Sequence, residues 1–95
     1  MDLRELVNHP ETTIVDVRTP SEFMSGHVEG SVNIPLDEVP YRIEEFRAMP
    51  GQIVLCCVSG GRSGQAQAYL SMHGLDNVHN GGGWMDVNFL KYHAA

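Results

Sequence analysis

Residues 53–63 constrain the fold of this chain more than any other stretch, because they combine a buried strand, a glycine-containing loop and the start of a helix. Residues 53–57 are aliphatic or cysteine, which is typical of a strand that is covered on both faces of a parallel sheet. From Arg62 onward the residues are mostly good helix formers, and Gly74 provides a helix end. The sequence therefore predicts that Cys57 lies between the end of a strand and the N-terminus of a helix.

This position predicts a reactive thiol at Cys57. The first turn of a helix has unpaired N–H groups and a partial positive charge, and successive loop amides can hold an anion. A cysteine beside such groups and an arginine has a lowered pKa. The predicted anion-binding loop consists of Val58, Ser59, Gly60, Gly61, Arg62 and Ser63. Cys56, by contrast, should point to the opposite face of the strand and pack in the core.

The size and the charge of the chain limit its function classes. Its 95 residues are expected to form one domain, over residues 1–95. A formal charge of −6 argues against nucleic acid or an anionic membrane as a partner. The cysteines and histidines lack the spacing of a zinc site, so neither a metal nor a cofactor is predicted. No apolar run of membrane-spanning length and no signal peptide is visible, so a cytoplasmic location is expected, and a processed export form stays open.

Helical and strand patterns alternate along the chain. Helices are predicted at residues 2–7, 19–26, 37–49, 62–74 and 84–92, and strands at residues 12–17, 31–34, 53–57 and 77–79, with a flexible turn at residues 81–83. Strands separated by helices imply right-handed crossovers and parallel pairing. The predicted fold class is α/β, with three α/β/α layers built on a small, mainly parallel central sheet.

A binding site in such a fold is expected at the carboxyl ends of the strands. Asp16 and Arg18 lie at the end of the strand at residues 12–17, so both are expected to support the site around Cys57. Arg18 is further expected to form a structural ion pair with Glu22 in the next helix. His27 is interpreted as a local hydrogen-bonding residue at a turn and not as a catalytic acid.

Three segments carry a resemblance to a known family, the single-domain rhodaneses, which are thiosulfate sulfurtransferases. Residues 16–18 (DVR), 22–23 (EF) and 26–35 (GHVEGSVNIP) are similar to the family's first signature, DVR…E[YF]…GHIxGAxNIP. Residues 53–63 (IVLCCVSGGRS) resemble its active-site segment, IVLYCxxGxRS, and residues 82–84 (GGW) resemble its GGxxxW segment. Two departures are Cys56, where an aromatic residue is common, and Val87, which replaces a frequent second tryptophan.

The resemblance implies a rhodanese-like fold and a specific chemistry. In that family's manner, Cys57 would accept a sulfane sulfur as a persulfide, and the loop from Val58 to Arg62 would cradle it. The implied partners are a small anionic sulfur donor such as thiosulfate and an acceptor that is cyanide or a thiol. A thioredoxin-like protein is a further candidate partner.

Two other functions stay open from the sequence. Counted from Cys56, the segment to Arg62 has the C-x5-R spacing of the related cysteine phosphatases, whose loop binds a phosphate. Gly60 lies three residues after Cys57, where both families tend to have a glycine, so the spacing favours the rhodanese register. The adjacent cysteines also allow a non-catalytic redox or binding module, since a neighbouring thiol can trap an oxidised sulfur.

Overall fold

The computed structural model describes residues 1–93, which form helices and strands in alternation. The elements are α1 (Leu3–Asn8), β1 (Thr13–Asp16), α2 (Pro20–Ser25), β2 (Val32–Asn33), the 3-10 helix η1 (Leu36–Arg42), α3 (Ile43–Ala48), β3 (Ile53–Cys57), α4 (Gly61–Met72), β4 (Val78–Gly83) and α5 (Trp84–Tyr92). The strands are short and every connection between neighbouring strands runs through helical residues. This order leaves parallel pairing as the natural solution for the sheet.

Within the described residues the strands form one four-stranded sheet in the order β2-β1-β3-β4, and every pair is parallel. β3 lies between β1 and β4, and all five of its residues are buried. The register places Asp16 beside Cys56 and Gly83 beside Cys57. The predicted α/β fold class with a parallel central sheet is therefore confirmed, and the strand that ends in the cysteine pair is central.

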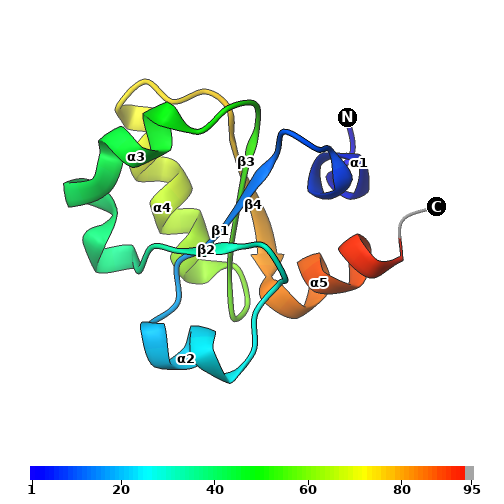
Figure 1. Cartoon of the computed structure of the whole chain (residues 1–95). Helices are drawn as coiled ribbons and strands as arrows, with labels where there is room; N and C mark the ends of the chain where they lie inside the picture. The colour runs from blue at the N-terminus through cyan, green and yellow to red at the C-terminus, as the bar shows by residue number, and fades with distance from the viewer. Residues whose placement is uncertain (94–95) are drawn as a thin grey trace.

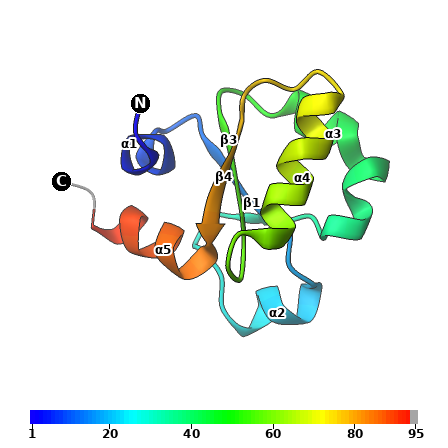
Figure 2. The same ribbon diagram turned by 180° about the vertical axis from the view of Figure 1, so that it is seen from behind.

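Helices cover both faces of the sheet and make the three predicted layers. α3, α4 and η1 lie on one face, whereas α1 and α5 lie side by side on the other (Figure 1, and from behind in Figure 2). Two hydrophobic clusters correspond to these faces: Phe46 and Leu70 belong to the first, and Val7 and Val87 to the second. Both α2 and the loop between β3 and α4 lie at the same end of the sheet (Figure 1).

The helix α2 forms as its sequence predicts. Thr19 caps the helix by accepting a hydrogen bond from the Glu22 amide, and the Glu22 carboxylate accepts one from the Thr19 amide. Pro20 occupies the first helical position, and Gly26 ends the helix. This reciprocal capping fixes the start of a six-residue helix that buries none of its residues, and it sets where the Glu22 side chain lies.

Two predicted elements differ from the structure. The helix predicted over residues 37–49 is a 3-10 helix followed by the short α3, and Pro40 lies inside the 3-10 segment, where it supplies no N–H for an α-helical bond. The turn predicted at residues 81–83 is wrong, because these glycines continue β4 to Gly83, which pairs with Cys57 of β3 after a shift in register. A Cβ atom on Gly81 would lie 2.7 Å from the Val54 side chain, so close packing explains this glycine in a strand.

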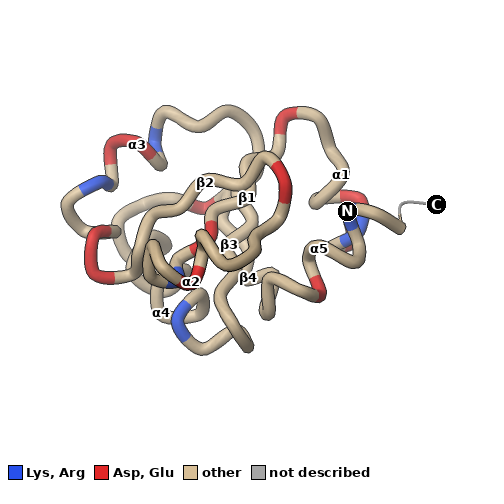
Figure 3. The backbone as a smooth tube through the Cα atoms, turned by 60° about the horizontal axis from the view of Figure 1, so that its bottom comes forward, with Lys and Arg blue, Asp and Glu red and all other residues tan. Residues whose placement is uncertain are grey.

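The charges are distributed over the chain with an acidic excess. The sequence has 12 Asp and Glu against 6 Lys and Arg, and Figure 3 shows the acidic positions spread over several elements. None of the helices in residues 1–93 combines the length and the apolar character that crossing a membrane requires.

Candidate active site

The side chain of Cys57 lies at the carboxyl end of β3, where the chain turns into α4. Only 1% of its surface is exposed. The turn depends on Gly60, which has a φ of 100° and forms the N-cap of α4. This left-handed conformation disfavours side chains, which explains the glycine three residues after the thiol. The turn brings the amides of the loop around the sulfur atom.

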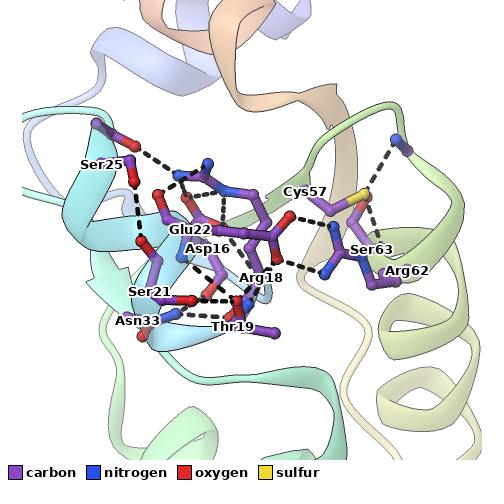
Figure 4. A network of polar contacts seen from close by, with 12 residues as sticks. Asp16, Arg18, Thr19, Ser21, Glu22, Ser25, Asn33, Cys57, Arg62 and Ser63 are labelled. Carbon is purple, nitrogen blue, oxygen red and sulfur yellow. Dashed lines mark hydrogen bonds and ion pairs between the residues drawn. The ribbon is translucent and has the colours of Figure 1, made fainter.

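Two amide donors and one hydroxyl group surround the Cys57 sulfur. The amides of Gly60 and Ser63 donate to Sγ at 3.0 and 3.5 Å, and the Ser63 hydroxyl oxygen lies 3.4 Å from Sγ (Figure 4). Burial by itself raises the pKa of the thiol, but the hydrogen bond with the Ser63 side chain and the hydrogen bonds from the loop amides outweigh burial and lower the pKa to about 7. A large fraction of Cys57 is therefore thiolate, the nucleophilic form, at neutral pH.

Cys56 lies on the other face of β3 and has the opposite character. Its side chain is fully buried and belongs to the cluster under α1 and α5, whereas Cys57 belongs to the cluster under α4. Burial, with a smaller contribution from the charge of Asp16, raises the pKa of Cys56 to about 12. The prediction that the two cysteines point to opposite faces is confirmed, and only Cys57 meets the loop amides.

Arg62, in the first turn of α4, pairs with Glu22 of α2. The Arg62 Nη1 and Nη2 atoms donate to the two Glu22 carboxylate oxygens at 2.8 and 3.0 Å (Figure 4). This pair lowers the pKa of Glu22 to about 2, through the hydrogen bonds from Arg62 before any other cause. The predicted ion pair between Arg18 and Glu22 is therefore wrong: Arg18 reaches only the Glu22 backbone carbonyl, at 3.3 Å. The Glu22 carboxylate therefore partly balances the positive charge of Arg62, which the sequence analysis assigned to anion binding.

Asp16 and Arg18 form a buried ion pair behind the site. Arg18 Nη2 lies 2.7 Å from the Asp16 Oδ2 atom and also donates to the Gly26 carbonyl at 2.7 Å. The guanidinium lies over the Trp84 ring, 4.7 Å from its centroid. Arg18 therefore connects β1, the end of α2 and the start of α5. These contacts fit the supporting role predicted for Asp16 and Arg18, since they hold the elements that frame the loop.

The remaining loop residues differ in exposure. Val58, Ser59 and Gly61 are exposed, and Ser63 is fully buried. His27 stacks on Phe23, and its Nδ1 atom lies 2.8 Å from the Phe23 carbonyl oxygen, in agreement with a local role. Among the described residues, no group of three or more His, Cys, Asp or Glu side chains could hold a metal ion.

Asn80 is a site residue that the sequence analysis missed. Its Oδ1 atom accepts a hydrogen bond of 2.6 Å from the Ser63 hydroxyl, and its Nδ2 atom donates to the Gly60 carbonyl at 3.0 Å. Asn80 lies in β4, immediately before the glycines that were interpreted as a turn. If the strand predicted at residues 77–79 is extended through those glycines, its parallel pairing with β3 places Asn80 near the end of β3. That extension is the step by which the sequence could have indicated Asn80.

A buried thiol at the end of a central parallel strand, with its sulfur held by the amides of a helix N-terminus, defines a cysteine-nucleophile site of α/β type. The chain matches the family model for the Rhodanese-like domain over residues 1–88. Thiosulfate sulfurtransferase PspE of Escherichia coli (strain K12) is 41% identical over 80 residues, which cover 81% of this chain and 75% of that protein. The chain therefore belongs to the rhodanese-like family, as its motifs predicted.

Two further comparisons agree with this assignment. Thiosulfate:glutathione sulfurtransferase of Saccharomyces cerevisiae is 32% identical over 91 residues, which cover 81% of this chain and 66% of that protein. A solved structure described as rhodanese with anions from E. coli superimposes with a TM-score of 0.72 at 38% identity, over 79% of this chain and 89% of the other. These relatives support a sulfurtransferase and favour neither the phosphatase register nor a non-catalytic module.

Proposed function

We propose that this sulfurtransferase takes a sulfane sulfur from thiosulfate, or from a similar anionic donor, onto Cys57 and passes it to a thiol or to cyanide. The observation that carries the proposal is the hydrogen bonding of the Cys57 sulfur, because the amides of Gly60 and Ser63 point at it within 3.5 Å. Such donors stabilise negative charge on sulfur, whether on the thiolate or on the persulfide that replaces it.

The first half-reaction forms the persulfide. The Cys57 thiolate attacks the outer sulfur of thiosulfate, a sulfur–sulfur bond forms, and the bond between the two sulfur atoms of thiosulfate breaks. Sulfite leaves with the electron pair of that bond. Because the pKa of Cys57 is about 7, this step needs no separate general base at neutral pH.

The second half-reaction returns the enzyme to its starting state. A thiolate or cyanide attacks the outer sulfur of the persulfide, takes that sulfur, and releases the Cys57 thiolate. The yeast relative is named for a glutathione acceptor, which supports a thiol in this role. A thioredoxin-like protein would supply the same chemistry on a larger partner, and a cytoplasmic location, rich in reduced thiols, is the setting that we propose.

Arg62 is proposed to attract the anionic donor while it holds the loop against α2. Its guanidinium is shared with Glu22 and about a third of its side chain is exposed, so the attraction is that of a partly balanced charge. The loop amides then provide the short-range hydrogen bonds. The E. coli structure with bound anions supports an anion site in the relatives of this chain.

Steady-state kinetics test this function directly. Turnover of thiosulfate with cyanide or glutathione should give parallel double-reciprocal plots, because sulfite leaves before the acceptor reacts. The same protein sample should be assayed with an aryl phosphate, which a phosphatase of the Cys56 register would hydrolyse. Sulfur transfer without phosphate release supports the proposal, and phosphate release without sulfur transfer contradicts it.

A further inference from the structure

Asn80 forms hydrogen bonds with the loop after β3 and with the first turn of α4, the two segments that surround the Cys57 sulfur. Its Oδ1 atom accepts from the Ser63 hydroxyl at 2.6 Å and from the Gly82 amide at 2.9 Å, and its Nδ2 atom donates to the Gly60 carbonyl at 3.0 Å. These partners fix the orientation of the amide. In a reversed side chain the NH2 group would face the Gly82 N–H, donor against donor, and the amide oxygen would face the Gly60 carbonyl, acceptor against acceptor. Asn80 therefore presents an acceptor, and not a donor, to Ser63.

The contact with Asn80 determines where the Ser63 proton points. A serine hydroxyl has one proton, and the short distance to Asn80 Oδ1 shows that the proton is directed there. The Ser63 oxygen then offers a lone pair to Cys57, 3.4 Å away, and can accept a hydrogen bond from the S–H group of the thiol. To donate to the thiolate, Ser63 must turn its proton away from Asn80. The bond to Asn80 therefore competes with hydrogen bonding to the thiolate.

The surrounding glycines leave room for the Asn80 amide. A Cβ atom on Gly64, in the first turn of α4, would lie 3.3 Å from Asn80 Nδ2. A Cβ atom on Gly60 would lie 3.4 Å from the Gly82 Cα atom and 3.8 Å from the same Nδ2 atom. The contact at Gly64 would be tight and those at Gly60 would be ordinary van der Waals distances, so the small residue at Gly64 lets β4 approach α4 with the Asn80 side chain between them.

We propose that Asn80 is a positioning residue for Cys57: it holds the Ser63 hydroxyl proton away from the sulfur and thereby limits how strongly Ser63 stabilises the thiolate. Asn80 acts through Ser63 and does not touch the sulfur. Only the importance of Asn80 for catalysis rests on the function proposed above. Its test reads the thiol itself, so the two can fail separately.

The test is the pH profile of Cys57 alkylation by iodoacetamide, read by peptide mapping. In Asn80→Ala the Ser63 proton is free to donate to the thiolate, so the midpoint of the profile should fall by at least about 0.5 pH unit. In Asn80→Asp the carboxylate holds that proton more strongly and adds a negative charge, so the midpoint should rise. A residue that only braced the loop would shift both variants in the same direction, and that result would overturn the proposal.

A double-mutant cycle separates the Ser63 contact from other effects of the substitution. In a Ser63→Ala background the hydroxyl is missing, so Asn80→Ala should no longer lower the midpoint. Gln67→Ala is the matched control, because Gln67 also bonds from α4 to β4, at the Val78 carbonyl, without contacting Cys57 or Ser63. A shift in the Gln67 variant, or an undiminished shift in the Ser63→Ala background, would contradict the role of Asn80.

The charged groups around the thiol stay constant in this test. They are Asp16 at the end of β1, Arg18 just after it, Glu22 in α2, Arg62 in α4 and Asp86 in α5, and none of the neutral variants changes them. Asn80 is exposed, so its replacement leaves the core intact, and unfolding curves of each variant verify that the fold persists. A wild-type protein that forms no persulfide would refute the proposed function, whereas unshifted Asn80 profiles would refute only the role of Asn80.

Discussion

Cys56 and Cys57 are neighbours in the chain with at most 1% of their surface exposed, yet their thiols have opposite properties. Cys56 packs among apolar side chains under α1 and α5, and its pKa is raised to about 12 by burial and the nearby Asp16 charge. Cys57 meets the loop amides and Ser63, and its pKa is lowered to about 7. Exposure does not distinguish the two residues. The hydrogen-bond donors at the end of β3 do, because they outweigh the cost of burying a thiolate.

Replacing each cysteine in turn should show the largest difference. Cys57→Ser removes the atom that carries sulfur, so transfer from thiosulfate should fall by at least about a thousandfold. Cys56→Ala should keep the rate within about tenfold and should lower the free energy of unfolding by about 1 kcal/mol, the effect of a small core deletion. Initial rates with cyanide as acceptor measure the first effect, and urea unfolding measures the second. A Cys56 variant as inactive as the Cys57 variant would contradict the rhodanese register, in which Cys57 is the nucleophile.

Alkylation of the native protein should distinguish the thiols through their pKa values. Thiolate is the reactive form, so below pH 7 the rate at Cys57 should fall about tenfold per pH unit, and above pH 8 it should level off. Cys56, whose pKa is about 12, should stay unlabelled at pH 7 in the folded state. Peptide mapping after iodoacetamide treatment gives both rates, and labelling in urea, where both thiols react, is the control. Labelling of Cys56 before Cys57 would contradict the assignment.

The buried pair behind Cys56 should matter mainly for stability. Arg18→Met leaves the Asp16 carboxylate buried without its partner, so the free energy of unfolding should fall by about 3 kcal/mol or more. The matched control is Arg47→Met, which breaks the exposed pair with Glu44 and should cost less than about 1 kcal/mol. Urea denaturation followed by circular dichroism compares them. Equal losses would show that Arg18 does not hold the frame of the site.

The smallest effect is expected at the ion pair on the Cys57 side. Glu22→Gln keeps the capping geometry of α2 but removes the charge that balances Arg62, so the KM for thiosulfate should fall about threefold, and less at high salt. Glu44→Gln, which frees Arg47 in α3 instead, should leave the KM unchanged. Kinetics over a series of thiosulfate concentrations measure both values. An unchanged or higher KM in the Glu22 variant would show that Arg62 does not attract the sulfur donor.

Much of the fold could be predicted because local signals agreed with the tertiary arrangement. The caps at Asp2 and Thr19 set two helix starts, and the apolar run of residues 53–57 marked the central strand. The opposite orientation of Cys56 and Cys57 follows from strand geometry alone. The position of the key thiol and the direction of its pKa shift could therefore be predicted from the sequence, as could the family to which the chain belongs.

Contacts between distant segments could not be predicted in the same way. The partner of Arg62 lies 40 residues away in α2, and only the fold shows that Glu22 is nearer to it than to the Arg18 side chain. Asn80 was hidden because three consecutive glycines suggested a flexible turn, whereas they continue β4, where Gly81 packs closely against Val54 and Val87 and Gly83 pairs with Cys57. In both cases a tertiary contact overrides the local preference, which is a nearby ion pair for Glu22 and a turn for the glycines.

The most direct test of the central claim is the location of sulfur after one half-reaction. The protein should be treated with thiosulfate, freed of excess donor, and examined by mass spectrometry as an intact chain and as peptides under non-reducing conditions. The account predicts one added sulfur atom on Cys57, its removal by cyanide, and an undiminished adduct in Cys56→Ala. Sulfur on Cys56, or an adduct that survives in Cys57→Ser, would contradict the account.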